Sequence, residues 1–153
     1  MQQPSLSDAG APLSAAQPVI DAPAALRAVQ AAVAHAAGLG VPVNVAVVDA
    51  AGLPVGFARM AGAPLHSIDI ASDKAYTAAS FGLPTSRWTE ALAGHSEAVR
   101  QGLVLRPRFV AFGGGLPIME GSARIGGIGV SGGSETQDED IARAGLVALG
   151  LQA

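Results

Sequence analysis

The first residues of chemical interest lie in the stretch SDKAYTAAS, residues 72–80, where Lys74 and Thr77 stand among small side chains. On a helix, residues three apart share one face. Because its neighbours are small, the ammonium of Lys74 could reach a cleft and bind a carboxylate ligand. Alternatively, Lys74 forms an ion pair with Asp69, with Asp73 or with an acid elsewhere in the fold. We treat Lys74 and Thr77 as candidate ligand-binding residues.

The three histidines offer few routes to metal chemistry. His35, His66 and His95 are widely separated, and the chain has no HxxxH or HExxH motif, so we expect no dedicated zinc site. His66 has the spacing to join Asp69 and Asp73 in a metal site on one helix, but a solvated helix face is the favoured interpretation. His35 is a candidate axial ligand for haem, although a lone histidine on a helix is more often a surface residue.

The sequence contains no recognisable motif of a catalytic nucleophile. It has no cysteine, no GxSxG motif and no Ser-His-Asp arrangement in a known order. Whether the protein is an enzyme therefore stays open at this stage.

Two glycine-rich segments indicate close approach of other groups to the backbone. The loop FGGGLPIMEG, residues 112–121, is permissive enough to lie against a ligand or a neighbouring subunit. Glycine weakens a strand interior, so Gly126, Gly127 and Gly129 should mark the place where a helix, a second subunit or a ligand lies against a strand.

The segment SGGSETQ, residues 131–137, joins that strand to a helix. Gly132 and Gly133 allow a sharp turn, and Ser134 and Gln137 have the spacing of a capping box. A helix N-terminus can also hold an anion. We favour the structural turn, because nearby acidic residues already complement the helix dipole.

The elements that must position these residues follow from start and stop signals. Asp21, Pro23 and Pro42 bracket a first helix that ends at Gly38 or Gly40. Two strands flanking the turn DAAG should form a hairpin. The remaining expected elements are helices within 63–82 and 83–95, a strand within 106–112, two strands turning at EGS (residues 120–122), and a helix over 135–151.

This order predicts an α+β domain, as two layers or a sandwich, with an antiparallel sheet of about five strands covered by helices. We expect one domain over residues 21–153, preceded by a flexible arm over residues 1–20 that is rich in Pro, Ala, Ser and Gln.

Composition narrows the choice of partners. Half of the 153 residues are hydrophobic and 14% are charged, which favours a homo-oligomer. The net charge of −3, the lack of a basic run and the 4% aromatic content argue against nucleic-acid binding. No segment indicates a membrane span or a secretory signal, and the absence of cysteine suits the reducing cytoplasm, where we expect the protein.

Four segments together resemble one known family: VNVAVVDAAGLPVGFARMAGA, SIDIASDKAYTAASFGLPT, GGGLPI and GGIGVSGGSETQDEDIARAGLVAL. Across residues 22–150 the chain is similar to the GlcG/HbpS-like haem-binding family, also found as the C-terminal domain of PduO-type corrinoid adenosyltransferases. The resemblance implies a profilin-like or PAS-like domain, homo-oligomers, and haem as a more expected cofactor than a corrinoid. It also implies an accessory role in the catabolism of small acids.

The resemblance also suggests where a small-molecule ligand would bind. The matched positions are Asp49, Arg59, Lys74, Thr77, Thr85, Gly114, Pro117, Gly132 and Gly133. We therefore expect a haem- or tetrapyrrole-binding oligomer. The alternatives are an enzyme whose Lys74 and Arg59 steer a carboxylate substrate, and an assembly module with no ligand.

Overall fold

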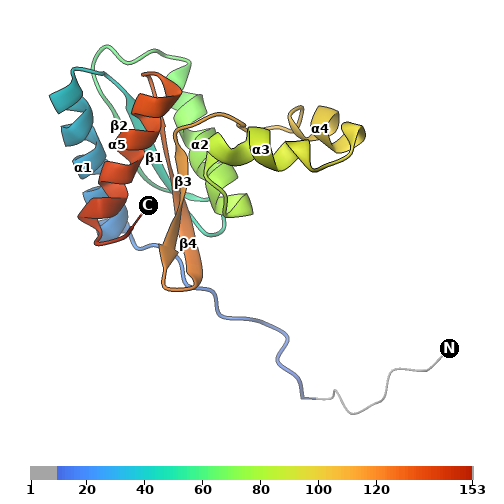
Figure 1. Ribbon diagram of the computed structural model, residues 1–153. Coiled ribbons are helices and arrows are strands. Elements are labelled where there is room, and N and C mark those ends of the chain that lie inside the picture. Colours follow the sequence, from blue (N-terminus) through green and yellow to red (C-terminus); the bar gives the residue numbers. More distant parts are fainter. Residues whose placement is uncertain (1–9, 153) are drawn as a thin grey trace.

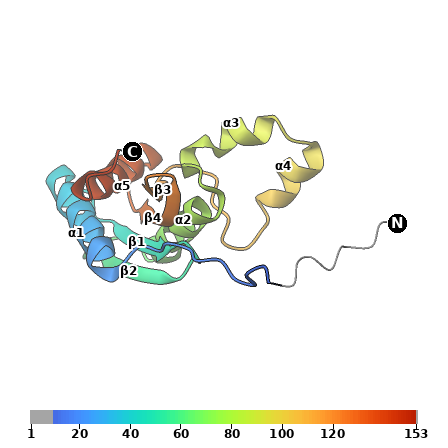
Figure 2. The same ribbon diagram turned by 90° about the horizontal axis from the view of Figure 1, so that it is seen from below.

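A β-sheet lies between two layers of helices in the computed structural model, which describes residues 10–152. Helices α1 (Ala22–Leu39) and α5 (Glu135–Ala148) pack side by side on one face of the sheet. Helix α2 (Ser67–Phe81) covers the other face (Figures 1 and 2). This arrangement confirms the predicted α+β class with helices covering the sheet.

The sheet consists of two antiparallel hairpins joined through their inner strands. Its strands are β1 (Asn44–Asp49), β2 (Pro54–Arg59), β3 (Gly115–Glu120) and β4 (Ala123–Ser131). Their order is β2-β1-β4-β3, so β1 and β4 are central. Val47 of β1 lies opposite Gly56 of β2 on one side and Ile128 of β4 on the other.

The sheet has four strands, so the expectation of about five was slightly too high. The strand expected within residues 106–112 is absent, because this backbone bonds to a helix side chain instead of a strand. Thr77 Oγ1 donates to the carbonyl of Arg108 at 2.9 Å and accepts from the N–H of Val110 at 3.1 Å. Arg108 also has a φ of 66°, which is incompatible with an extended strand.

Most predicted helix ends are confirmed by their caps. The Asp21 carboxylate accepts from the N–H of Ala22, Gly40 and Gly82 end α1 and α2 in the left-handed conformation, and Ser134 begins α5 with a complete capping box. Helix α5 ends at Ala148, a little before the expected Leu151.

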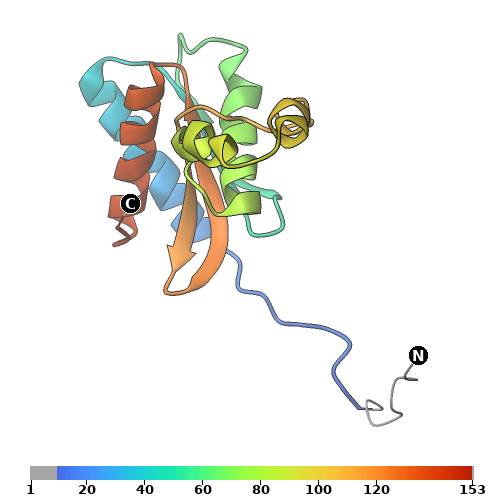
Figure 3. The ribbon, with the colours of Figure 1, turned by 45° about the vertical axis from the view of Figure 1, so that its right-hand side comes forward.

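The segment that follows α2 and contains two further short helices projects away from the sheet, and we call it the projecting arm to distinguish it from the N-terminal arm of residues 1–20. One short helix was expected within residues 83–95. The chain instead makes a 3₁₀ turn at Thr85–Arg87, which has no side-chain cap, and then α3 (Trp88–Ala93) and α4 (Glu97–Leu103). Helices α3 and α4 extend away from the sheet (Figures 1 and 3).

The two faces of the sheet have different cores. Between the sheet and the α1–α5 layer lie branched side chains such as Val45, Val47 and Ile128. On the α2 face the core is smaller and consists of Ala46, Val48, Ala71, Ala75 and Ala79. Helix α2 therefore approaches the sheet closely.

The glycines of β4 make this close approach sterically feasible. A Cβ atom on Gly129 would overlap the carbonyl oxygen of Ala71, and one on Gly127 would overlap that of Ala75. Of the three occupants considered from the sequence, a helix is the one that lies on Gly127 and Gly129, whereas Gly126 faces β1 and the side chain of Ile20.

The predicted arm over residues 1–20 falls partly outside the described residues, which begin at Gly10. Residues 11–19 contain no helix or strand, and Ile20 is buried with its N–H bonded to the carbonyl of Ile125 at 2.9 Å. Within residues 10–152, no helix combines the length and apolar character needed to cross a membrane.

Candidate functional site

Lys74 lies in the interior, with only 1% of its side chain exposed. Its Nζ donates to Oδ2 of Asp138 at 3.0 Å and to the carbonyl of Val130 at 2.8 Å. The ring of Phe112 lies 5.1 Å away, within the range of a cation–π contact. The ion-pair partner is thus an acid on α5, and neither Asp69 nor Asp73.

Asp138 completes this buried pair from the first turns of α5. Its Oδ1 accepts the N–H of Gly133 at 2.8 Å. Burial raises the pKa of Asp138 and lowers the pKa of Lys74, and the attraction between the two charges opposes both shifts only in part. The pair joins α2, α5 and the end of β4, and it has no solvent-exposed donor to offer a ligand in this subunit.

Gly114 and Gly132 lie next to the pair because no side chain fits there. A Cβ on Gly114 would meet Lys74 Nζ at 2.6 Å and the Val130 carbonyl oxygen at 2.5 Å. Gly132 has a φ of 146°, and its Cβ would lie 2.5 Å from the carbonyl oxygen of Pro42. Together with the capping box, this geometry supports the structural interpretation of the SGGSETQ turn.

Thr77 and Thr85 hold the chain that leads into β3. Thr77 bonds to residues 108 and 110 as described, and Thr85 Oγ1 accepts the N–H of Gly115 at 2.8 Å. Pro117 lies in β3 opposite Gly127. These residues therefore anchor the segment around the buried pair.

Asp49 and Arg59 hold local turns away from Lys74. Asp49 Oδ1 accepts the N–H groups of Ala51 and Leu53, at 2.8 and 3.1 Å, in the β1–β2 turn. Arg59 Nη2 donates to the carbonyl of Ala63 at 2.8 Å. The structure gives Lys74 and Arg59 different partners, so the two do not meet as a joint carboxylate clamp within one subunit.

His35 occupies the outer surface of the α1–α5 layer. Its side chain is 39% exposed, and its Nε2 lies 3.0 Å from Oδ2 of Asp140 on α5. The other ring nitrogen has no hydrogen-bond partner among residues 10–152. Nε2 is thus oriented by a carboxylate, and Nδ1 is the ring nitrogen left without a hydrogen bond to a described residue.

The helix-borne trio of His66, Asp69 and Asp73 does not form a metal site. Within the described part of the chain, no three His, Cys, Asp or Glu side chains gather closely enough to hold a metal ion. Asp73 instead accepts from Nε of Arg108 at 2.9 Å.

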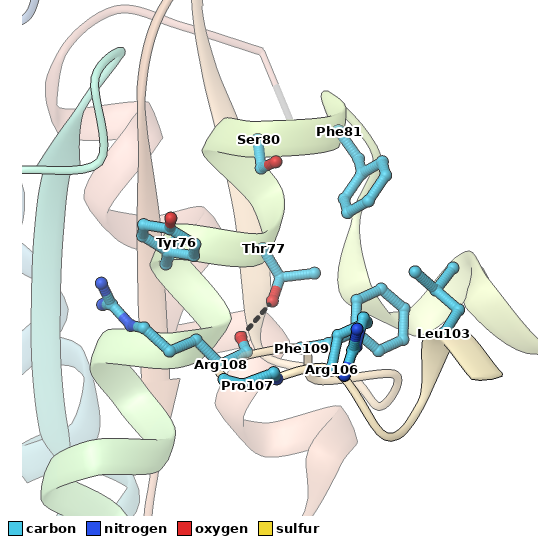
Figure 4. A pocket seen from close by; sticks show the side chains of 9 residues that line it. All are labelled: Tyr76, Thr77, Ser80, Phe81, Leu103, Arg106, Pro107, Arg108 and Phe109. Atoms are coloured by element: carbon cyan, nitrogen blue, oxygen red, sulfur yellow. Dashed lines mark hydrogen bonds between the residues drawn. The ribbon is translucent and has the colours of Figure 1, made fainter.

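A hollow between α2 and the chain leaving α4 was not predicted. Figure 4 shows side chains from both segments around it, and its volume is about 110 Å³. Its lining consists of Tyr76, Thr77, Ser80, Phe81, Leu103, Arg106, Pro107, Arg108 and Phe109. Sequence reasoning placed Thr77 in a site but missed Arg106 and Arg108, because RPRF was assigned to a strand. The alternation of arginines with ring-bearing residues was the available signal.

The comparisons with known proteins identify the family. The model of the family described as "Haem degrading protein HbpS-like" matches residues 20–147. The chain belongs to this HbpS-like family, which confirms the resemblance seen in the sequence.

Three proteins illustrate the relationship. The corrinoid adenosyltransferase PduO of Citrobacter freundii is 35% identical over 123 residues, which are 80% of this chain and 37% of PduO. A double mutant of HbpS from Streptomyces reticuli is 35% identical with a TM-score of 0.81, covering 99% of each chain. The crystallised complex of PduOC with haem is 38% identical with a TM-score of 0.73, covering 80% of this chain and 88% of PduOC.

Proposed function

We propose that this protein is a haem-binding homo-oligomer in which His35 is the axial ligand of the iron. The observation that carries the proposal is the likeness to PduOC, which was crystallised with haem and shares the fold at 38% identity. Haem supplies a redox-active iron whose properties depend on its axial ligand and surroundings. Sequence and structure together support binding, and they assign no catalytic residue.

The donor set around His35 suits haem iron. A metal-bound histidine commonly has its second ring nitrogen bonded to a carboxylate, which fixes the ring and raises its basicity. Asp140 provides that carboxylate, with 55% of its side chain exposed, so the pair is reachable from solvent. With Nε2 donating to Asp140, His35 would hold the iron of a bound haem through Nδ1.

The surface around His35 is also suitable for a flat apolar ligand. Ala31 and Leu39 stand one turn before and after His35 on α1, and Val147 stands two turns after Asp140 on α5. Leu39 and Val147 are exposed, at 47% and 63%. Because α1 and α5 are antiparallel, Leu39 and Val147 lie on opposite sides of the His35–Asp140 contact, and a planar tetrapyrrole at His35 would cover the apolar surface of α1 next to Leu39.

A second copy of the chain would shield the other side of such a haem. The hollow beside α2, at about 110 Å³, is smaller than the roughly 300–1,000 Å³ pockets that enclose drug-sized ligands. A haem on an exposed helix face would keep one side in water unless another subunit packed against it. Haem binding and the proposed homo-oligomer are thus connected.

Histidine substitution tests the assignment of the axial ligand. Haem is titrated into the wild-type protein and into His35→Ala, and the Soret absorption reports binding. We expect His35→Ala to weaken haem binding at least tenfold and to change the Soret position, because the iron loses its protein ligand. Asp140→Asn should weaken it about 10–100-fold, the usual effect of losing such a partner.

His66→Ala and His95→Ala are the matched controls, because both histidines are exposed and neither lies in the α1–α5 layer. Their haem affinity should equal that of the wild type. Unchanged affinity in His35→Ala, or a loss in a control variant only, would show that another residue binds the iron.

We also propose a cytoplasmic location, which fractionation of the native host cells would test.

A further inference from the structure

We propose that the hollow between α2 and residues 103–109 binds a small monocarboxylate with a compact apolar tail. This site would be separate from the haem site, because α2 and the α1–α5 layer lie on opposite faces of the sheet (Figure 1). The inference does not depend on haem binding.

The floor of the hollow is aromatic and firmly packed. Phe81 and Phe109 contact each other edge to face, with ring centroids 5.9 Å apart, and both lie 4.8 Å from the ring of Trp88. Trp88 is buried, and its indole N–H has no hydrogen-bond partner among residues 10–152. Such rings supply a preformed apolar surface for a ligand's hydrocarbon part.

Two arginines at the rim, Arg106 and Arg108, differ in whether they form an ion pair. Arg108 stacks on the ring of Tyr76, with its guanidinium 3.8 Å from the ring centroid, and pairs with Asp73. Arg106 forms no ion pair within residues 10–152. A guanidinium without a counter-charge beside an apolar hollow is suited to a carboxylate, which it can bind through two parallel hydrogen bonds.

The wall that carries these arginines is preorganised. Arg108 is the one non-glycine residue with a positive φ between residues 10 and 152, and Thr77 fixes the backbone there through the carbonyl of Arg108 and the N–H of Val110. A strained backbone of this kind persists where the surrounding structure fixes it, and such positions cluster at ligand sites. Holding the loop in advance reduces the entropy that a ligand must overcome.

The size of the hollow limits the ligand. Its volume of about 110 Å³ is somewhat below that of an apolar cavity of about 150 Å³ that accepts benzene. The hollow is partly open to solvent, and Arg106 is an exposed residue of its lining, so a carboxylate can stay at the guanidinium while one ring or a short branched chain enters (Figure 4). Benzoate and isovalerate are suitable probes.

Binding is measured by calorimetry and by the fluorescence of Trp88, which is the single tryptophan of the chain and packs against Phe109. We expect saturable benzoate binding to the wild-type protein with a change in Trp88 emission. Benzamide, which has the same ring without the charge, should bind at least tenfold more weakly. Arg106→Gln should weaken benzoate at least tenfold and leave the melting temperature unchanged, because Arg106 is exposed.

Arg27→Gln is the control, since Arg27 is an exposed arginine on α1 without an ion pair to a described residue. It should bind benzoate like the wild type. Equal binding of benzoate and benzamide, no saturable binding, or full affinity in Arg106→Gln would each overturn the proposal. A haem propionate offers the same chemistry, so failure with benzoate together with reduced haem affinity in Arg106→Gln would assign the hollow to haem.

Discussion

At the scale of single residues, the main finding is that Lys74 and Asp138 form a buried ion pair. The side chains are 1% and 3% exposed, so both charges have lost most of their hydration. The attraction between the two ions offsets this loss only while both partners are present. Lys74 thus has a structural role within the subunit, and a role in ligand binding stays a prediction.

Substituting one partner should be more harmful than substituting both. Lys74→Met or Asp138→Leu alone leaves a buried polar group unpaired, and we expect each to lower the free energy of unfolding by about 3–5 kcal/mol. The double variant should be more stable than either single variant, although it still leaves the N–H of Gly133 and the carbonyl of Val130 without these partners. Arg143→Ala, which removes the partly exposed pair with Glu139, is the control and should cost about 0–1 kcal/mol.

Urea unfolding of these variants measures the differences. A Lys74→Met variant as stable as Arg143→Ala would contradict the structural role of the buried pair.

The pair should also give stability a defined pH dependence. The folded-state pKa of Asp138 is raised above its ordinary value of 3.8, so folded protein keeps a proton that unfolded protein releases. The resulting stabilisation is present below pH 3.8 and is lost as the pH rises through the folded pKa. For Lys74 the lowered pKa means that stability recovers as the pH rises from its folded pKa towards 10.5.

The measurement is the free energy of unfolding of the wild type minus that of Lys74→Met/Asp138→Leu across this pH range. We expect the difference to fall on leaving acid pH and to rise again at alkaline pH. A difference that rises on leaving acid pH would show that the folded state favours ionised Asp138 more than water does.

At the scale of elements, the main feature is the close packing of α2 on β4. Gly127 and Gly129 of β4 face the alanines of α2, so the helix backbone lies where their side chains would otherwise be. We expect Gly129→Ala to destabilise the protein by about 1–3 kcal/mol through overpacking. Gly38→Ala is the control, because its Cβ would enter open space on α1 and should stabilise by about 0.5–1 kcal/mol. Thermal melts that rank Gly129→Ala at or above the wild type would contradict this packing.

A second prediction at this scale concerns Gly132, in the turn from β4 into α5. Gly132→Val combines a positive φ with overlap against Pro42, and the backbone strain alone should cost about 1–3 kcal/mol. We expect a larger drop in melting temperature than for His35→Ala, His66→Ala or His95→Ala. A Gly132→Val variant that melts with the histidine variants would refute a conformational requirement for glycine.

The elements were predictable where local signals govern them. Asp21, Gly40 and the Ser134–Gln137 box act within a few residues, so the ends of α1 and the start of α5 followed from the sequence. The segment 106–112 did not, because its course depends on bonds to Thr77 on a distant helix.

The candidate site was only partly predictable for the same reason. Lys74, Gly114, Gly132 and Gly133 were named from the sequence and do lie together, but Asp138, which bonds to Lys74 and Gly133, was counted only among the acidic residues that complement the helix dipole. Sixty-four positions separate Lys74 from Asp138, so no spacing pattern connects them.

At the scale of the whole molecule, we expect a stable homo-oligomer. Apolar side chains remain exposed on α1, on α5 and along the projecting arm, including Leu26, Val147 and Leu105. Half of the chain is hydrophobic, so association would remove surface that a monomer leaves in water. Light scattering at micromolar concentration should give a mass well above the 15.1 kDa of one chain. A monomer mass would contradict both the homo-oligomer and the shielding of haem between subunits.

Haem binding is measured by an absorption titration of the purified wild-type protein with haem. We expect a Soret band that grows to a sharp end point at a fixed ratio of haem to chains. A difference spectrum that rises linearly without an end point, as for haem dispersed on a nonspecific surface, would contradict it.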